Sequence, residues 1–353
     1  MFFSSKHPDR TVSTEKGELL FFSGTSYLGM AVNTDFQELI KEGIGIYGTN
    51  YGSSRTSNLR LNVFEQAEEY LCEWTGAAAS LTMSSGFLAG QLIAQWIREL
   101  ASNGYTIIYA PHTHPAVFSG LEQEKKQTFE QWTADARAIA TSVQKLVLVC
   151  NSVDVLNAQV HDFQWLKEII SDNNREIILI ADDSHGIGVI GKNGNGIFSQ
   201  IPDLQNIKKV VVASLGKALG MSAGIVLANA DVIDKLRKST FYSGASPALP
   251  AYLYAFLRAK HIHQTQLEKL KENISLFSSQ LSDFQLFDYT LTHPVFRTYQ
   301  NDLYAYLLEN KVLISSFPYP TPDSELITRV VLSSLHTKED IEKLLMLLRQ
   351  KIS

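Results

Sequence analysis

The stretch VVVASLGKALGMSAG, residues 210–224, decides how the rest of the chain is interpreted. Its first residues are apolar and β-branched, which predicts a buried strand. Small residues follow, and one lysine, Lys217, lies among them. Burial at the end of a strand would lower the pKa of this amine and favour Schiff-base chemistry, and the hydroxyl of Ser214 suits a phosphate oxygen. A solvated loop lysine is the simpler interpretation, so the rest of the chain must decide.

The composition is that of an ordinary globular protein. Of 353 residues, 45% are apolar and 19% are charged, which predicts a large core in two domains or in one large domain with a smaller companion. The 31 basic and 36 acidic residues give a net charge of −5 without a basic tract, so nucleic acid and anionic membranes gain no support as partners.

The first residues, MFFSSKHPDR, lack the apolar core of a signal peptide, and no apolar run approaches the length of a membrane span. The two cysteines, Cys72 and Cys150, have apolar neighbours and fit buried positions better than a disulfide or a metal site. We therefore expect a cytoplasmic protein.

Strand and helix patterns alternate through the middle of the chain. Apolar strands separated by helical segments predict an α/β fold with a mostly parallel sheet covered on both faces. Polar clusters follow several of the strands, at the end where open α/β sheets bind ligands. The predicted strands are 77–83, 105–109, 145–150, 177–180, 210–213 and 224–228, and the predicted helices are 61–74, 87–100 and 163–171.

The flanking regions have a different character. The glycine-rich segment 43–57 predicts a loop, and the charge-rich segment 249–281 predicts a long helix. Strands and shorter helices follow, ending in a capped helix from Thr337. We expect an N-terminal segment (1–45) that packs with the small domain, a large cofactor-binding α/β domain (46–240) and a C-terminal α+β domain (241–353).

Four groups at the predicted strand ends suit one cofactor. Ser84-Ser85-Gly86 opens a helix and can bind an anion, although a plain serine N-cap explains it equally well. Asp182 can pair with a protonated ring nitrogen, His185 can hydrogen-bond an oxygen, and His114 can stack on a planar ring. Together with Lys217, these groups supply what pyridoxal 5′-phosphate requires.

Two other patterns suggest different chemistry. Residues 186–192 match G-x-x-x-x-G-K, the phosphate loop of nucleotide hydrolases, but Asn193 stands where that motif needs Ser or Thr. His112, His114, Asp182, Asp183 and His185 could suggest a metal hydrolase, but that interpretation leaves Lys217 without a role. No G-x-S-x-G motif of serine hydrolases is present.

Two motifs, DDSHGIGVIGKNGNG (182–196) and SLGKALG (214–220), resemble those of the α-oxoamine synthases. The similarity runs from Tyr27-Leu28-Gly29 to Leu335-His336-Thr337. It implies a fold-type-I pyridoxal-phosphate transferase, a mostly parallel sheet with a smaller α+β C-terminal domain, and a homodimer with shared active sites. The implied reaction condenses an amino acid with an acyl-CoA or another acyl thioester and releases CO₂, giving a 2-amino ketone.

The resemblance also implies roles for individual residues. Lys217 would hold the cofactor covalently, Asp182 would bind its ring nitrogen, His185 its phenolic oxygen, and His114 would stack on its ring. Arg329 would bind the amino acid's carboxylate, with Thr25 beside the substrate. The implied phosphate-binding residues are Ser85, Gly86, Phe87 and Ser214, joined by Ser243 and Gly244 from the neighbouring subunit.

The sequence departs from the family's pattern on the substrate side. Thr25, Asn151 and Val155 stand where Asn, Glu and Ser are usual, and Leu59 and Phe64 replace a Gly and a His. Alanine with a pimeloyl thioester is the leading substrate pair. Another synthase specificity or a pyridoxal-phosphate aminotransferase is the alternative, with a nucleotide hydrolase as a remote one.

Overall fold

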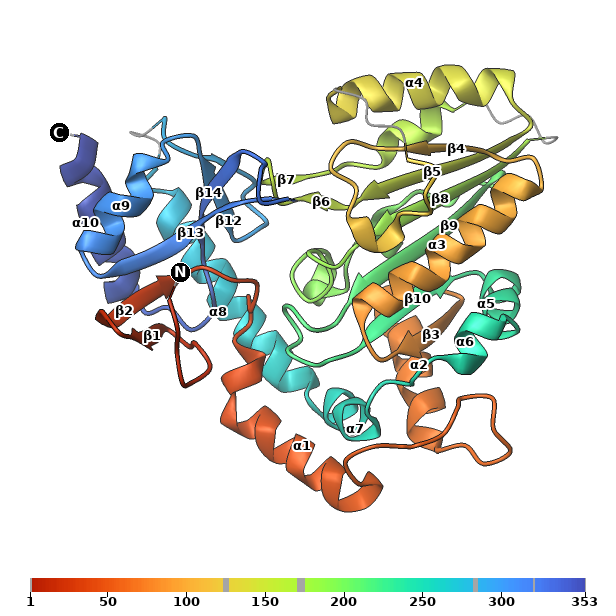
Figure 1. Cartoon of the computed structure of the whole chain (residues 1–353), viewed down its shortest axis with the longest axis horizontal. Coiled ribbons are helices and arrows are strands. Elements are labelled where there is room, and N and C mark those ends of the chain that lie inside the picture. The colour runs from red at the N-terminus through yellow and green to blue at the C-terminus, as the bar shows by residue number, and fades with distance from the viewer. Residues whose placement is uncertain (1, 123–126, 170–174, 282–284, 320, 353) are drawn as a thin grey trace.

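The computed structural model describes residues 2–122, 127–169, 175–281, 285–319 and 321–352. Two six-stranded sheets dominate it. Figure 1 shows them side by side, the larger with the middle of the chain and the smaller with both ends of the chain. The long helix α8 (Lys260–Ser278) runs between them.

The larger sheet has the strand order β3-β10-β9-β8-β5-β4. Four neighbouring strands, β9, β8, β5 and β4, run parallel, whereas β10 is antiparallel to both of its neighbours. This arrangement confirms the prediction of a mostly parallel sheet. The strands are β3 (Ala79–Met83), β4 (Thr106–Tyr109), β5 (Lys145–Asn151), β8 (Glu176–Asp182), β9 (Ile207–Ser214) and β10 (Gly224–Ala228).

Helices cover both faces of this sheet because alternate strand residues point to opposite sides. In β5, Val147 and Val149 belong to the cluster with α3 (Gly86–Ser102) and α5 (Ala230–Arg237). Leu146, Leu148 and Cys150 belong to the cluster with α2 (Asn62–Thr75) and α4 (Phe129–Ser142). These apolar layers fix the strand register, and with it the positions of the residues at the strand ends.

The smaller sheet has the order β1-β2-β13-β14-β12-β11. Its N-terminal hairpin pairs with the C-terminal half through β2 and β13, which run parallel and place Leu20 opposite Val312. The boundaries 1–45, 46–240 and 241–353 stay a prediction. The elements are β1 (Thr11–Thr14), β2 (Gly17–Phe22), β11 (Asp288–Tyr289), β12 (Val295–Thr298), α9 (Asp302–Glu309), β13 (Val312–Pro318), β14 (Leu326–Val331) and α10 (Lys338–Ile352).

Three segments differ in detail from the prediction. The segment 43–57 is not all loop, because α1 (Thr34–Tyr47) continues through its first five residues. The segment 249–281 forms two helices, α7 (Pro250–Arg258) and α8, which meet at Ala259. Within 163–171 only a 3₁₀ helix, Gln164–Glu168, forms, and residues 170 and 171 lie outside the described residues.

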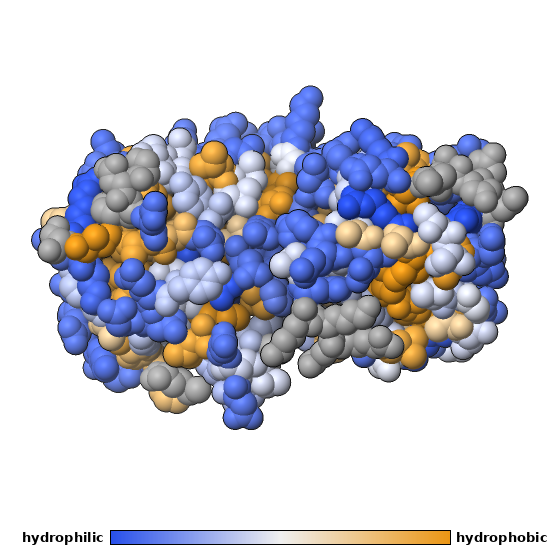
Figure 2. All heavy atoms as spheres, turned by 90° about the horizontal axis from the view of Figure 1, so that it is seen from above, coloured by the Kyte–Doolittle hydropathy of each residue, from blue (hydrophilic) through white to orange (hydrophobic). Residues whose placement is uncertain are grey.

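The remaining elements are short. The strands β6 (Val153–Asp154) and β7 (Gln159–Val160) form a hairpin, and α6 (Thr240–Gly244) is a single helical turn and a little more. Seen from above, hydrophilic residues cover most of the surface, with smaller apolar areas between them (Figure 2). Within the described ranges, no helix has the length and apolar character to cross a bilayer.

Candidate active site

The strand ends of the larger sheet form one side of a cleft. In the register of the parallel strands, Asn151 of β5 lies opposite Asp182 of β8, and Asp182 lies opposite Val212 of β9. The smaller sheet supplies the other side through β13 and β14. The cleft has a volume of about 220 Å³. Among its lining residues are six predicted site residues: Thr25, His114, Asp182, His185, Lys217 and Arg329.

Lys217 lies three residues beyond β9, in the turn that leads back into β10. Burial lowers the pKa of its amine from 10.5 to about 8, and the nearby Arg329 acts in the same direction while Asp182 opposes it. The Nζ atom is 2.6 Å from Nε2 of His185. Near neutral pH this amine therefore exchanges its proton far more readily than a surface lysine.

Asp182 ends β8 and is almost completely buried. Its Oδ1 atom accepts a hydrogen bond of 2.9 Å from the amide of Ser184, and its Oδ2 atom lies 3.9 Å from Nδ1 of His114. Burial lowers the pKa of His114, so its imidazole is neutral at pH 7. One carboxylate oxygen and one uncharged ring thus border the same cleft.

His185 is half-buried, lines the cleft and has two side-chain partners. Nε2 faces Lys217, and Nδ1 lies 2.8 Å from the hydroxyl of Tyr27. Burial holds the pKa of His185 well below its usual value, and the charge of Lys217 contributes in the same direction. A neutral imidazole between a lysine and a tyrosine donates through one nitrogen and accepts through the other.

Arg329 carries a buried guanidinium that borders the cleft. It is 8% exposed, and NH1 donates to the carbonyl of Val155 at 3.1 Å. Its Nε atom is buried and unpaired, and among the described residues no carboxylate lies within ion-pair distance. Burying an unpaired charge is costly, so the cleft is prepared for an anion.

The predicted phosphate cradle lies where α3 meets the end of β9. Ser85 is the N-cap of α3 and accepts from the amide of Leu88, so the N-cap interpretation holds. Its hydroxyl can still donate, and α3 is a 17-residue helix with its amide end at this point. A Cβ added at Gly86 would come within 2.3 Å of Cβ of Ser214, so only glycine lets helix and strand approach this closely. The exposed side chain of Phe87 leaves only its backbone for this role.

Ser243 and Gly244 lie in α6 and do not line the cleft. The loop that follows α1 holds Ser243 from two sides: Ser54 donates to its carbonyl at 2.6 Å, and its hydroxyl is 3.0 Å from that of Thr56. Their role in a neighbouring subunit stays a prediction. Arg55, from the same loop, is buried and pairs with Glu68 at 2.7 Å, which anchors this loop on α2.

Asn151, His112 and Asp154 also line the cleft, and they hold the loop of His114, a role that the sequence did not predict. Asn151 accepts from the amide of His114 at 3.0 Å and donates to the carbonyl of His112 at 2.6 Å. His112 has a φ of 58° and is held by Asp154 at 2.8 Å, which raises the pKa of His112. These contacts fix the loop that carries His114. The sequence signal was the position of Asn151 at a strand end.

The G-x-x-x-x-G-K segment serves the fold instead of a nucleotide. Asp183, fully buried, accepts from Ser152 at 2.5 Å and from the amide of Ile197 at 2.9 Å, and burial raises its pKa to about 7. Lys192 begins a 3₁₀ turn whose second residue, Asn193, is left-handed, where a phosphate loop would continue into an α-helix. Among the described residues, the predicted histidines and aspartates form no group that could hold a metal ion.

The residues present fit pyridoxal 5′-phosphate. The cofactor needs an amine of low pKa, a carboxylate for its ring nitrogen and an anion cradle for its phosphate. Lys217 supplies the amine, the Oδ2 atom of Asp182 supplies the carboxylate, and the N-terminus of α3 supplies the anion site. Because Gly86 has no side chain, the backbone N–H groups at this N-terminus can approach a phosphate closely. Arg329 leaves a cationic position for a carboxylate beside them.

Known proteins resemble this chain along most of its length. The chain is 25% identical to 8-amino-7-oxononanoate synthase of Fervidobacterium nodosum over 360 residues, covering 94% of this chain and 90% of the relative. It is 24% identical to a biotin biosynthesis bifunctional protein of Cutibacterium acnes, covering 99% of this chain and 55% of that protein.

Two solved structures show the same fold. A serine palmitoyltransferase from S. paucimobilis has a TM-score of 0.82 at 15% identity, covering 99% of this chain and 92% of its own. An 8-amino-7-oxononanoate synthase from Francisella tularensis has a TM-score of 0.72 at 20% identity, covering 95% and 98%. The fold is therefore that of the fold-type-I pyridoxal-phosphate transferases. Residues 19–348 match the profile of aminotransferase class I and II, so the chain belongs to this family and its cofactor is pyridoxal 5′-phosphate.

Proposed function

We propose that this protein is a C-acyltransferase that condenses an amino acid with an acyl thioester and releases CO₂, with alanine and a pimeloyl thioester as the leading pair. The product would be 8-amino-7-oxononanoate, a role in biotin biosynthesis. The relatives that carry the name of that synthase, at 24–27% identity over nearly the whole chain, support this choice. They support the reaction type more strongly than the identity of either substrate.

The observation that carries the proposal is the meeting of Lys217 and Arg329 in one cleft. A buried guanidinium without an acidic partner suits the carboxylate of an amino acid, because it is always charged and binds two oxygens at once. Lys217 lies close enough to Arg329 for the guanidinium to contribute to the lowered pKa of its amine, which is about 8. A bound amino acid would neutralise the one and present its α-carbon to the other.

Each residue of the cleft has a separate task in this proposal. Bound pyridoxal phosphate acts as an electron sink for the negative charge left on the α-carbon. Asp182 holds a proton on the ring nitrogen, His114 keeps the ring plane fixed, and Lys217 accepts the α-proton at Nζ. Near neutral pH such an amine is a better base than an unperturbed lysine, because part of the population is already unprotonated.

The acyl chain has an apolar wall available. The apolar residues that line the cleft are Val155, Leu156, Phe317 and Ile327. Methylene groups placed against such a wall are stabilised by about 0.8 kcal/mol each. A chain of several methylenes is therefore favoured over an acetyl group, which supports a medium-length acyl thioester.

Asn151 and Val155 favour a second candidate, a pyridoxal-phosphate aminotransferase. Asn151 accepts from the amide of His114 and donates to the carbonyl of His112, so its amide positions the loop that carries both histidines. Val155 presents its carbonyl to Arg329 and an apolar side chain to the cleft. Neither residue supplies the polar group that the synthases usually have here, whereas amino-group transfer does not require an acyl site.

The test is a screen for free thiol with small amino acids against acyl-CoA substrates of increasing length. We expect release with alanine and a dicarboxylic or medium-length acyl chain, and none with acetyl-CoA. Formation of a 2-oxo acid from the amino acid without thiol, when a keto-acid acceptor is added, would establish the aminotransferase instead. Thiol release in no combination would refute the synthase proposal.

We also propose that the protein acts in the cytoplasm as a homodimer, with Ser243 and Gly244 facing the neighbouring subunit's phosphate site. Both residues lie outside the cleft of their own chain, in the exposed turn next to the loop that carries Ser54 and Thr56. Light scattering of the purified protein tests the dimer, and a monomer with full activity would contradict it.

A further inference from the structure

Three segments that lie far apart in the chain meet at His185. Lys217 contacts its Nε2 atom, and Tyr27, from the segment that follows β2, contacts its Nδ1 atom. His293, which precedes β12, lies 3.1 Å from the carbonyl of His185 through its own Nε2 atom. The imidazole nearest to the proposed cofactor lysine is thus held by residues from both ends of the chain.

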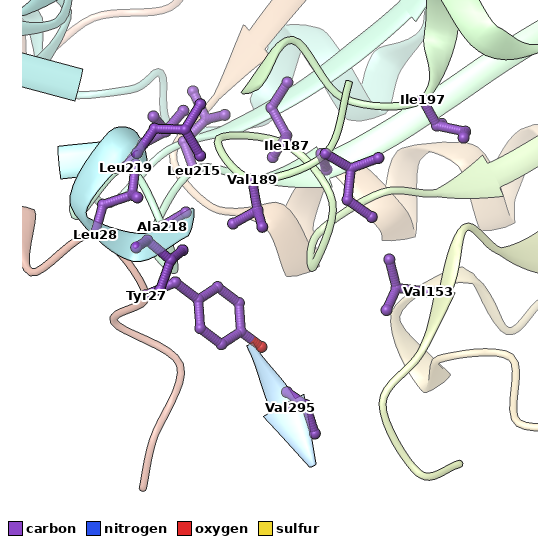
Figure 3. Close-up of a cluster of buried hydrophobic side chains, with 14 of the residues drawn as sticks. Tyr27, Leu28, Val153, Ile187, Val189, Ile197, Leu215, Ala218, Leu219 and Val295 are labelled. Atoms are coloured by element: carbon purple, nitrogen blue, oxygen red, sulfur yellow. The ribbon is translucent and has the colours of Figure 1, made fainter. Parts of the chain in front are cut away.

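Tyr27 contributes one polar atom to an apolar environment. Figure 3 shows it in a cluster of buried side chains that includes Leu28, Ala218, Leu219 and Val295. Its ring is 1% exposed, and burial raises the pKa of its hydroxyl further above the neutral range. The hydroxyl therefore keeps its proton, and it can either donate or accept.

The contacts of His185 require that its two nitrogens change roles together. When Lys217 is an ammonium, Nε2 must accept from it, so Nδ1 carries the ring proton and donates to the oxygen of Tyr27. When Lys217 is a free amine, Nε2 can carry the proton and donate, and Nδ1 then accepts from the hydroxyl of Tyr27. A tyrosine satisfies both tautomers because its hydroxyl is both a donor and an acceptor, whereas a carboxylate or an amide N–H would satisfy only one.

His293 holds this arrangement from behind. It is completely buried, burial lowers its pKa to about 3, and it is therefore neutral. Its Nε2 carries the proton that is donated to the carbonyl of His185, and its Nδ1 is buried without a partner. Its ring meets the ring of Tyr27 edge to face at 5.4 Å between centroids, so one residue contacts both members of the pair.

We propose that Tyr27 is a positioning residue whose hydroxyl lets His185 serve Lys217 in both protonation states of the lysine, and that His293 fixes the backbone of His185 for this purpose. The inference rests on Lys217 being the cofactor lysine, as proposed above. It concerns the protein without cofactor or substrate, so it can fail while the proposed reaction stands, and the reverse is also true.

Other charged and titratable groups act on the same pair. Asp182, from β8, favours the ammonium form of Lys217, whereas Arg329, from β14, disfavours it. His114 and His293 also lie within electrostatic range of His185. Among the described residues, Nδ1 of His185 is hydrogen-bonded by the hydroxyl of Tyr27 and by none of these groups, so removal of that hydroxyl affects the tautomer of His185 without removing a charge.

The experiment is nitrogen NMR of the histidine rings in full-length protein freed of cofactor, recorded from pH 6 to pH 10. The signal of His185 is assigned by its loss in His185→Gln. In the wild type we expect the ring proton to move from Nδ1 to Nε2 as Lys217 loses its proton, with a midpoint near its pKa of about 8. In Tyr27→Phe, Nδ1 loses its acceptor in the ammonium state and its donor in the free-amine state. A buried N–H without a partner costs more than a buried acceptor without one, so the midpoint should fall, by about half a pH unit or more.

Matched variants separate this effect from a general loss of structure. Tyr109→Phe removes a half-buried hydroxyl that bonds Ser119 at 2.7 Å, away from the cleft, and should leave the midpoint unchanged. His293→Gln keeps a donor for the carbonyl of His185 and should preserve the wild-type profile, whereas His293→Phe should alter it.

Three results would overturn the inference. The first is an unchanged midpoint in folded Tyr27→Phe, and the second is an equal shift in Tyr109→Phe. The third concerns the wild type alone: the ring proton of His185 stays on the same nitrogen below and above pH 8, so the two nitrogens do not exchange roles. Identical profiles for His293→Gln and His293→Phe would refute the part assigned to His293.

Discussion

At the scale of single residues, the site combines two cations that the protein alone leaves uncompensated. Arg329 has no acidic partner among the described residues, and Lys217 keeps a lowered pKa because burial and Arg329 outweigh the attraction of Asp182. Both features cost stability in the ligand-free protein and are relieved when an anionic substrate enters. The two groups therefore lower the stability of the ligand-free protein and raise its affinity for an anionic substrate.

Arg329→Met is therefore expected to weaken substrate binding without lowering the stability of the protein. Loss of the guanidinium removes charge-assisted hydrogen bonds worth about 1.5–3 kcal/mol, so kcat/KM for the amino acid should fall by roughly 10- to 150-fold. The midpoint of urea unfolding of the cofactor-free protein should stay the same or rise, since an unpaired buried charge is removed.

Arg297→Met is the matched control, because Arg297 lies opposite Arg329 in the register of β12 and β14 but does not line the cleft. It should leave kcat/KM for the amino acid nearly unchanged. A clear loss of stability in Arg329→Met, with unchanged amino-acid kinetics, would mean that Arg329 is a structural residue.

Lys217 predicts a rise in stability at alkaline pH. In the unfolded chain its amine binds a proton up to pH 10.5, whereas in the folded, cofactor-free protein it does so only up to about pH 8. Between these values the unfolded state binds more protons, so the contribution of Lys217 to the free energy of unfolding rises with pH. The full difference amounts to about 3 kcal/mol.

The measurement compares cofactor-free wild type with Lys217→Met in urea from pH 7 to pH 10.5. The tyrosines affect both proteins alike, so the difference between the two curves isolates Lys217. We expect Lys217→Met to be the more stable protein at pH 7, with the gap closing as pH rises. A constant gap would show that the amine keeps its ordinary pKa.

Residue types at strand ends explain what the sequence could predict of the site. Lys217, Asp182, His185 and His114 each follow an apolar strand, and the geometry of a parallel sheet brings such positions together. Arg329 came only from the family resemblance, because it lies within an ordinary strand pattern. Tyr27 and His293 were not predicted as partners of His185, since no periodic pattern links positions so far apart.

At the scale of elements, α1 shows how a tertiary contact overrides local preference. Its C-terminal half contains glycines, and each costs a helix about 1 kcal/mol relative to alanine, which is why the segment 43–57 resembles a loop. Yet α1 packs on α7 so closely that a Cβ at Gly43 would lie 2.8 Å from the carbonyl oxygen of Ala251. The glycine that weakens the helix is the residue that lets it dock.

Two glycines of this helix therefore predict opposite outcomes. Gly43→Ala should destabilise the protein by about 1–3 kcal/mol, because the added methyl group meets the backbone of α7. Gly45→Ala adds a methyl group with nothing within 4 Å, so it should stabilise the protein by about 0.5–1 kcal/mol through helix propensity alone. Urea unfolding measures both. Equal changes in the two variants would contradict the close contact between α1 and α7.

The break between α7 and α8 lies beyond prediction from the sequence for a different reason. Ala259, where the two helices meet, is a strong helix former, and neither Gly nor Pro stands beside it. The break is set by tertiary packing, because α7 packs against α1 and α2, whereas α8 continues toward the smaller sheet. A single amphipathic helix could not serve both surfaces.

At the scale of the whole molecule, the strand alternation predicted the larger sheet correctly because its strands are buried on both faces. The smaller sheet could not be predicted in its order, since β1 and β2 join it from the opposite end of the chain. Pairing across such distances depends on surfaces that form only after both ends have folded.

Subunit complementation tests the proposed sharing of active sites. Lys217→Ala removes the proposed cofactor lysine, and Ser243→Asp places a negative charge where the neighbouring subunit's phosphate is proposed to lie. If sites are shared, each mixed dimer regains one intact site, so an equal mixture of the two inactive proteins should recover about a quarter of wild-type activity. The mixture must be unfolded and refolded together to exchange subunits. Recovery of no activity, with mixed dimers present, would place the whole site within one chain.

The hydrogen bonds of the segment 21–27 have a consequence for the order in which this protein matures during synthesis. Ser334 donates its amide to the carbonyl of Tyr27, and His336 lies 2.9 Å from the carbonyl of Phe21, so both partners are translated last. The larger sheet can assemble during translation, because all of its strands are synthesised before the C-terminal segment. The backbone of Tyr27, by contrast, gains its hydrogen bond from Ser334 only when the last residues have been made. We therefore expect nascent chains halted before residue 334 to protect the large sheet from proteolysis while residues 21–27 remain cleavable.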